Sequence, residues 1–246
     1  MADKQCNTVN LFVPCDMDMF TPGIAPSVIT LLEKLGDSVY YNPESTCCGR
    51  RFFMEGAIDC AKQLGEKLMS EYNQKYDMVI PSSACVGYIK NHYRKLFENV
   101  VVPADLKHFT QNVYELCDYI VNVKGVTCLN NTFKQRVFYF KSCAARNSYK
   151  LGREPEILLG NTKGLDLLMD ESLNFCCSAN GRFSTQNPET SDMMLKKIVD
   201  KIYSMGAQYV TSTDVHCLQY LEAHIESLGG GVEVIHIADI LTNDEV

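Results

Sequence analysis

The stretch STCCGR at residues 45–50 places two adjacent cysteines, Cys47 and Cys48, directly before a glycine. Successive side chains of an extended chain point to opposite faces, so neighbouring cysteines are poorly suited to filling a core. A loop that presents two thiols side by side can supply two thiolates to a metal or redox site. The pattern around the other cysteines decides the fold.

In the first half, each cysteine of this pattern follows a short apolar run typical of a buried strand. The runs are Val9–Val13 before Cys15, Val39–Tyr41 before Cys47, and Asp77–Ile80 before Cys85. Apolar residues at helical spacing predict a helix between the first and second runs and another between the second and third. They are Ile29, Leu32 and Leu35 in the first helix, and Ile58, Ala61, Leu64 and Leu68 in the second.

The second half repeats this order. The predicted strands are Arg136–Phe140 before Cys143, Leu173–Phe175 before Cys176 and Cys177, and Gln208–Thr211 before Cys217, with a helix over residues 194–202. The cysteine spacings also match: 31 and 36 residues separate the cysteines of the first half, and 32 and 39 those of the second. A lone cysteine, a pair and a second lone cysteine therefore occur twice.

Alternating strands and helices predict an α/β protein built from parallel sheets with crossover helices. We expect two tandem, related cysteine-rich domains, residues 1–127 and 128–246, divided where Gly, Asn and Thr interrupt the pattern between residues 125 and 132. Ligands bind at the carboxyl ends of parallel strands, so the four cysteines of each half are expected to meet at one sheet edge. The candidate metal ligands are Cys15, Cys47, Cys48, Cys85, Cys143, Cys176, Cys177 and Cys217.

Composition narrows the function classes. A net charge of -7 and the absence of a basic cluster argue against a nucleic-acid partner. The sequence contains no run of 18 apolar residues, so we expect no direct insertion into a membrane. The polar start of the chain predicts no signal peptide, so we expect a cytoplasmic protein. Twelve cysteines in a reducing compartment indicate metal or redox chemistry rather than structural disulfides. The four outside the repeat are expected to be ordinary thiols: Cys6, Cys60, Cys117 and Cys128.

The repeated unit resembles the cysteine-rich domain family built on a Cys-Cys-Gly motif. This domain occurs twice in one of the subunits of heterodisulfide reductase and in iron-sulfur subunits of glycolate oxidase and of L-lactate utilisation systems. The resemblance covers nearly the whole chain. It is carried by Pro14-Cys15, Thr46-Cys47-Cys48-Gly49, Pro81 to Cys85, Ser142-Cys143 with Arg146, Gly164-Leu165, Cys176-Cys177 with Gly181, Phe183 and Ser184, and Ser212-Thr213-Asp214 before Cys217.

The resemblance implies one iron-sulfur cluster per repeat, of the [4Fe-4S] type, held by the eight cysteines. It also implies an oxidoreductase subunit that transfers electrons during oxidation of a small 2-hydroxy acid, L-lactate to pyruvate, and is inactive without partner subunits. No Cys-x-x-Cys-x-x-Cys run is present here, so a ferredoxin-type partner is expected to carry the conventional clusters. The alternatives are a related thiol-disulfide reductase, a glycolate or succinate oxidoreductase subunit, or a non-redox zinc-binding interaction module.

Several positions depart from the family pattern. Tyr88 and Tyr220 stand where heterodisulfide reductase relatives carry a fifth cysteine, which leaves the choice between a cubane and a non-cubane cluster open. Ser178 replaces the motif glycine, and Phe140 and Ala144 replace two histidines common in the second repeat. The second repeat is thus either a working site with altered surroundings or a degenerate copy.

Several polar residues beside the cysteines have more than one interpretation. His216 is a ligand, a proton donor or an ordinary loop histidine, and the two tyrosines are oxygen ligands or packing residues. Asp214 and Arg146 either orient a substrate or form loop hydrogen bonds. Arg146, with Arg50 and Arg51, also supplies positive charge that offsets clustered thiolates.

Overall fold

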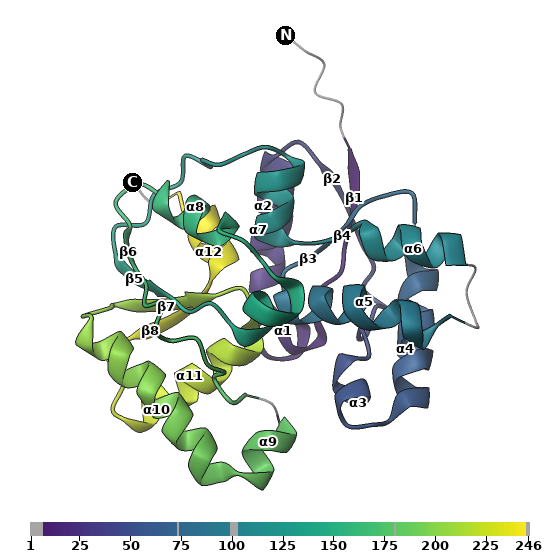
Figure 1. Cartoon of the computed structure of the whole chain (residues 1–246). Coiled ribbons are helices and arrows are strands. Elements are labelled where there is room, and N and C mark those ends of the chain that lie inside the picture. Colours follow the sequence, from purple (N-terminus) through teal and green to yellow (C-terminus); the bar gives the residue numbers. More distant parts are fainter. Residues whose placement is uncertain (1–6, 73, 99–102, 180, 245–246) are drawn as a thin grey trace.

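The computed structural model describes residues 7–72, 74–98, 103–179 and 181–244 (Figure 1). These residues form two four-stranded sheets in which all strand pairs are parallel. The first sheet contains β1 (Thr8–Leu11), β2 (Ser38–Tyr41), β3 (Met78–Ile80) and β4 (Val113–Glu115), and the second contains β5 (Arg136–Tyr139), β6 (Asp166–Leu168), β7 (Tyr209–Ser212) and β8 (Glu233–His236). Their orders, β2-β1-β3-β4 and β6-β5-β7-β8, are equivalent, which confirms the predicted α/β fold with two related halves.

Helices connect the strands in both halves. Those of the first half are α1 (Cys15–Phe20), α2 (Ile24–Lys34), α3 (Arg50–Met54), α4 (Ile58–Glu71), α5 (Ser83–Leu96), α6 (Pro103–Gln111), α7 (Leu116–Asp118) and the π-helix η1 (Tyr119–Val123). Those of the second half are the π-helix η2 (Ala144–Tyr149), α8 (Glu154–Gly160), α9 (Gly181–Gln186), α10 (Pro188–Ser204), α11 (Val215–Ser227) and α12 (Ile237–Thr242). Among the described residues, no helix combines the length and the apolar character needed to cross a bilayer.

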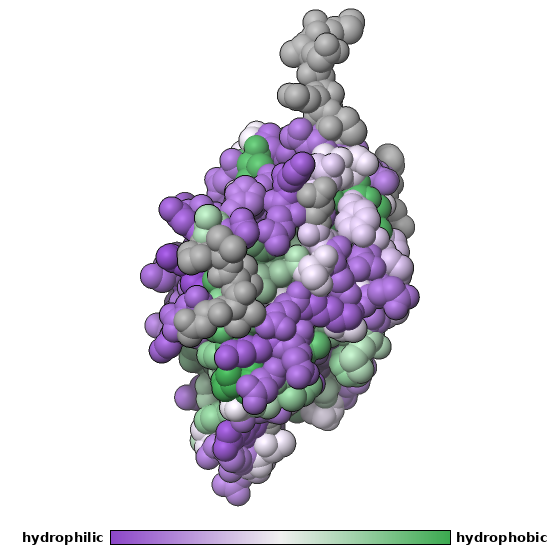
Figure 2. All heavy atoms as spheres, turned by 90° about the vertical axis from the view of Figure 1, so that its right-hand side faces the viewer, coloured by the Kyte–Doolittle hydropathy of each residue, from purple (hydrophilic) through white to green (hydrophobic). Residues whose placement is uncertain are grey.

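Alternation along the buried strands divides the interior into three cores. Leu11 faces a central core shared by the two halves, whereas the next residue, Phe12, faces a core formed with α4, α5 and α6. In the second half Val137 faces the same central core, and Phe138 faces a third core formed with α10 and α11. The outer helices are amphipathic, so the face of the first half that carries α4 and α6 is mostly hydrophilic, with scattered apolar side chains (Figure 2).

The two halves are held together by more than a shared core. α12, from the end of the second half, packs on α2 of the first half, and α5 packs on η2. At the second contact a Cβ on Gly87 would lie 2.5 Å from Ser148 Oγ and 2.9 Å from Tyr149 N, so only glycine permits this approach. The domain boundary at residues 127 and 128 stays a prediction.

One predicted strand is wrong. Residues 173–175 are not extended in a sheet, and the strand of that position is β6, which ends at Leu168. Asp170 explains the difference, because its carboxylate accepts a hydrogen bond from Ser172 N at 2.8 Å and its carbonyl accepts one from Leu173 N at 3.2 Å. Such an aspartate-centred turn competes with strand pairing.

Candidate metal centres

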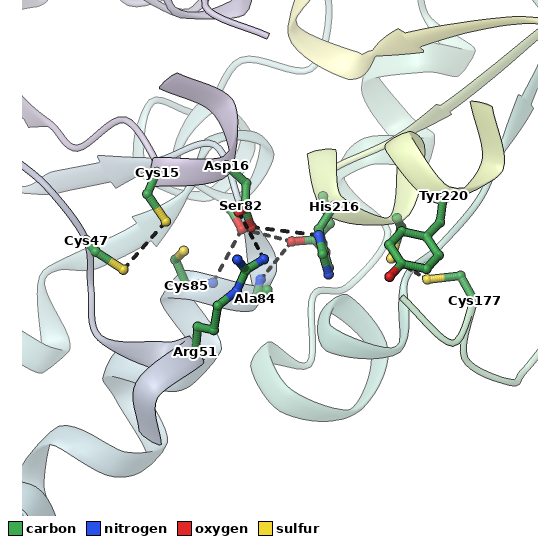
Figure 3. Close-up of polar contacts among 12 residues, drawn as sticks. Cys15, Asp16, Cys47, Arg51, Ser82, Ala84, Cys85, Cys177, His216 and Tyr220 are labelled. Atoms are coloured by element: carbon green, nitrogen blue, oxygen red, sulfur yellow. Dashed lines mark hydrogen bonds and ion pairs between the residues drawn. The ribbon is translucent and has the colours of Figure 1, made fainter. Parts of the chain in front are cut away.

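The first centre lies at the carboxyl edge of the first sheet. Cys15 begins α1 after β1, Cys47 and Cys48 occupy the loop between β2 and α3, and Cys85 lies in the first turn of α5 after β3. The Sγ atoms of Cys15 and Cys47 are 3.5 Å apart (Figure 3). Those of Cys48 and Cys85 are also 3.5 Å apart. Four of the predicted ligands, which lie up to 70 positions apart in the sequence, are therefore brought together.

The second centre repeats this arrangement. Cys143 directly precedes η2, Cys176 and Cys177 occupy the loop between β6 and α9, and Cys217 lies in the first turn of α11. Cys143 and Cys176 have their Sγ atoms 3.3 Å apart, and Cys177 and Cys217 have theirs 2.8 Å apart. In both halves the first lone cysteine pairs with the first cysteine of the loop, and the last lone cysteine pairs with the second.

The backbone of each Cys-Cys loop needs a left-handed residue after the pair. In the first loop Gly49 has φ +85°, and a Cβ there would lie 2.8 Å from Ala61 O. Ser178 adopts the equivalent conformation with φ +61°, which is unfavourable for a residue with a side chain. Its buried hydroxyl offsets this cost through contacts with Ser191 O at 3.0 Å and Ser191 Oγ at 2.6 Å. The departure from the motif glycine is thus accommodated by α10.

The same backbone turn supplies hydrogen-bond donors to sulfur. Gly49 N donates to Cys47 Sγ at 3.4 Å, and Ser178 N donates to Cys176 Sγ at 3.3 Å. Hydrogen bonds with the thiols of Cys15 and Cys48 lower the pKa of Cys47 to about 3, assisted by Gly49 N. The pKa of Cys176 also falls to about 3, chiefly through hydrogen bonds with its two neighbouring thiols. Each centre therefore stabilises a thiolate, the form that ligates metal.

The thiols outside the two centres lie apart from them. Cys117 is fully buried in the central core, whereas Cys60 on α4 and Cys128 are exposed. Cys6 falls outside the described residues. All eleven described cysteines are free thiols. Over the same part of the chain, no three His, Cys, Asp or Glu side chains form a group that could hold a single metal ion, and each four-thiol centre consists of two close pairs of sulfur atoms.

The two tyrosines at the fifth-cysteine positions differ. Tyr88 is buried one helical turn after Cys85, and its hydroxyl has no hydrogen-bond partner among the residues that the structure describes. Burial and the nearby Cys48 and Cys47 raise the pKa of Tyr88. By contrast, the hydroxyl of Tyr220 is 3.2 Å from Ser184 Oγ. An unpaired buried hydroxyl beside thiols is the kind of group that would donate to the sulfur of a bound cluster.

Asp214 links the two halves directly behind the cysteines. This buried carboxylate accepts hydrogen bonds from Ser82 Oγ and Ala84 N, both at 2.9 Å, and from Ser142 Oγ. Ser82 and Ala84 precede Cys85, whereas Ser142 precedes Cys143, so one side chain contacts the cysteine loops of both repeats. The sequence predicted Asp214 either to orient a substrate or to form loop hydrogen bonds, and it did not predict the link between the repeats, because a contact across 132 positions leaves no local pattern.

The other two polar candidates have local roles. The guanidinium of Arg146 donates to Lys141 O at 3.0 Å and to Leu173 O at 2.9 Å, and so ties the loop before Cys176 to the loop before Cys143. His216 packs edge-on against Tyr220, with ring centroids 5.4 Å apart, and its Nδ1 lies 3.9 Å from Asp16 Oδ2. Burial lowers the pKa of His216.

The first centre opens onto a cleft of about 660 Å³. All four of its cysteines line this cleft, together with residues of α3, α9 and α11. Figure 3 shows the first centre on one side, His216 and Tyr220 on the other, and Arg51 between them. The first group of thiols is thus accessible from a solvent-facing hollow.

Comparison with known proteins matches the same two segments. The family described as "Cysteine-rich domain" matches residues 9–90 and 137–222, and each segment contains one complete four-cysteine set. The chain belongs to this cysteine-rich domain family. The resemblance expected from the cysteine motifs is confirmed.

Full-length relatives extend the family assignment. Lactate utilization protein A of Oceanobacillus iheyensis is 31% identical over 236 residues, which cover 95% of this chain and 96% of that protein. The protein of the same name from Bacillus subtilis is 29% identical, with 96% and 99% covered. A hypothetical protein from Helicobacter pylori of known crystal structure shares the fold with a TM-score of 0.64 at 12% identity, covering 96% of this chain and 48% of that one.

Proposed function

We propose that this chain is an iron-sulfur subunit of a complex that oxidises a small 2-hydroxy acid, L-lactate to pyruvate. The observation that carries the proposal is the twofold occurrence of the same four-thiol centre in a homologue of lactate utilization protein A. Oxidation of L-lactate releases two electrons and two protons per pyruvate. The electrons would pass to partner subunits, among them a ferredoxin-type iron-sulfur protein.

The donor set fits an iron-sulfur cluster in each half. Cys15, Cys47, Cys48 and Cys85 would hold the first, and Cys143, Cys176, Cys177 and Cys217 would hold the second. Clusters of this kind, which we propose to be [4Fe-4S], are bound by thiolates and supply one-electron transfer when present. Adjacent cysteines suit ligation of different irons of one cluster, whereas structural zinc sites usually space their paired ligands by two to four residues.

The protein groups around the thiols would set the potential and keep the centres in place. Gly49 N and Ser178 N donate to sulfur, and the positive charge of Arg51 adds to the lowering of the pKa of Cys47. Hydrogen bonds and positive charge favour the more negative, reduced form of such a centre. The positions of Tyr88 and Tyr220 weigh against the thiol-disulfide reductase alternative, since the related chemistry is associated with a fifth thiolate there.

The test uses the complete complex. A tag on this chain would recover it with its partner subunits from cells grown on lactate, without exposure to oxygen. We expect L-lactate to bleach the visible absorption of the complex and to yield pyruvate at one molecule per two electrons transferred. Reduction by glycolate, succinate or a dithiol, with none by L-lactate, would assign the chain to one of the alternative enzymes instead.

A further inference from the structure

The cleft beside the first centre is built from both halves of the chain. The first half contributes the four thiols of the first centre and α3, and the second half contributes α9 and the start of α11. A hollow of about 660 Å³ at the junction of two halves has the size and position typical of small-molecule sites. The side chains that line the cleft therefore indicate what kind of molecule it could bind.

Three arginines line this cleft in a chain whose net charge is -7. Arg51 forms an ion pair with Asp16, with Nη2 3.5 Å from Oδ1. No ion pair or hydrogen bond of the guanidinium groups of Arg50 or Arg182 is found with any residue that the structure describes. Arg50 is moreover half-buried, where an unpaired charge is costly. Two guanidinium groups, one from each half, thus face the cleft without an acidic partner.

The position of Arg50 relates this charge to both centres. Its charge contributes to lowering the pKa of Cys176 in the second centre, after the effects of neighbouring thiols and Ser178 N. It also adds to the lowering of the pKa of His216, which is caused first by burial. Arg50 thus lines the cleft beside the first centre, and its charge also acts on the second centre.

We propose that this cleft binds the carboxylate of a small 2-hydroxy acid through Arg50 and Arg182. A guanidinium presents a planar fork of N–H donors that matches a carboxylate, and an anion would supply the acceptors that both groups lack. The inference rests on the proposed function for the identity of the acid, and it goes beyond it by assigning substrate binding to this chain instead of a partner. Arg51 and Asp16, already paired, would shape the site without carrying the added anion.

The experiment is calorimetric titration of L-lactate into the full-length chain, purified and reconstituted without oxygen. The variants are Arg50→Gln, Arg182→Gln and the double variant. Each single change is expected to weaken binding by about tenfold or more, because a charge-assisted hydrogen bond to the carboxylate is lost. Arg153→Gln is the matched control, since this arginine has an 81% exposed side chain and lies outside the cleft; its binding should equal that of the original chain.

Three results would overturn the inference. The first is that the original chain does not bind L-lactate, and the second is that the double variant binds it as tightly as the original chain. The third is that the variants bind L-lactate normally but no longer assemble with the partner subunits, which would make the cleft a protein-docking surface. Iron is measured on the same samples, and binding is measured whether or not iron is present, because the arginines belong to the chain itself. Absence of iron contradicts the proposed function, whereas an iron-loaded chain that fails to bind lactate contradicts only this inference.

Discussion

At the scale of single residues, the two centres are less alike than their cysteines suggest. The first has a strain-free Gly49 in its loop and an unpaired tyrosine hydroxyl behind it, whereas the second has Ser178 held by α10 and a paired Tyr220. Side-chain hydroxyls and backbone donors around thiolates tune a bound cluster. We therefore expect the two clusters to have different potentials.

Replacing Tyr88 by phenylalanine tests whether its hydroxyl donates to the first cluster. Loss of one hydrogen bond, worth about 1 kcal/mol, should lower the midpoint potential of that cluster by roughly 40 mV. The potential falls because the hydrogen bond stabilises the reduced, more negative cluster more than the oxidised cluster. Redox titration followed by EPR measures the change, and Tyr76→Phe, at an exposed tyrosine, is the control. An unchanged potential would mean that Tyr88 only packs against its neighbours.

Gly49 offers a test of the loop itself, with Gly56 as a matched control because both have φ +85°. Gly56→Ala should cost about 1–2 kcal/mol from backbone strain alone, since nothing lies within 4 Å of its added Cβ. Gly49→Ala should cost more and should reduce iron in the first centre, because its Cβ would meet Ala61 O at 2.8 Å. Urea unfolding and iron analysis provide the two measurements. Equal costs for the two variants would contradict this account of the loop.

At the scale of elements, each cysteine loop is positioned by a strand that ends just before it and a helix that begins just after it. α12 lies away from the cysteine loops in the sequence and packs the end of the second half against α2 of the first half. Its N-cap is His236, whose Nδ1 accepts a hydrogen bond from Ala238 N at 3.2 Å. Burial lowers the pKa of His236 to about 4, so the cap is made by the neutral ring.

This cap predicts a pH dependence of stability. In the unfolded chain the histidine takes up a proton below about pH 6.5, but in the folded chain it does so only near pH 4. The unfolded state therefore binds more protons between these values. The contribution of His236 to the free energy of unfolding is fully present above pH 6.5. As pH falls toward 4, up to about 3 kcal/mol of it is lost.

His236→Asn should remove this part of the acid loss, because asparagine caps a helix without titrating. Urea unfolding at several pH values between 4 and 7 measures it. The slope of stability against pH should be smaller in the variant than in the original chain. Identical slopes would show that His236 titrates normally in the folded protein.

At the scale of the whole molecule, the sequence predicted more of the centres than of the way they are joined. The cysteine spacing and the strand patterns before Cys15, Cys85 and Cys217 identified both centres and the parallel sheets. The edge strands β4 and β8 were not predicted, because each is short and includes a glutamate, which leaves no continuous apolar run. The shared core, the α12 contact and the cleft arise from packing between distant segments, which no local pattern records.

Replacing Asp214 tests most directly how the two halves are joined. Asp214→Ala would leave two buried hydroxyl groups and the half-buried Ala84 N without their acceptor and should cost about 3 kcal/mol or more. Because Asp214 contacts the loops of both repeats, iron should fall in both centres. The control is Asp166→Ala, where an exposed pair with Arg136 is worth about 1 kcal/mol or less. Loss confined to the second centre would contradict the coupling.

The central claim is that both four-thiol centres hold iron-sulfur clusters. The most direct measurement is iron and acid-labile sulfide content with EPR spectra, on full-length chain purified without oxygen. The original chain is compared with Cys47→Ser, with Cys177→Ser and with the control Cys60→Ser, an exposed thiol outside both centres. The account predicts that each of the first two variants loses a different EPR signal and about half of the iron, while the control keeps both. A chain that takes up no iron, or a Cys177→Ser variant with unchanged iron, would contradict it.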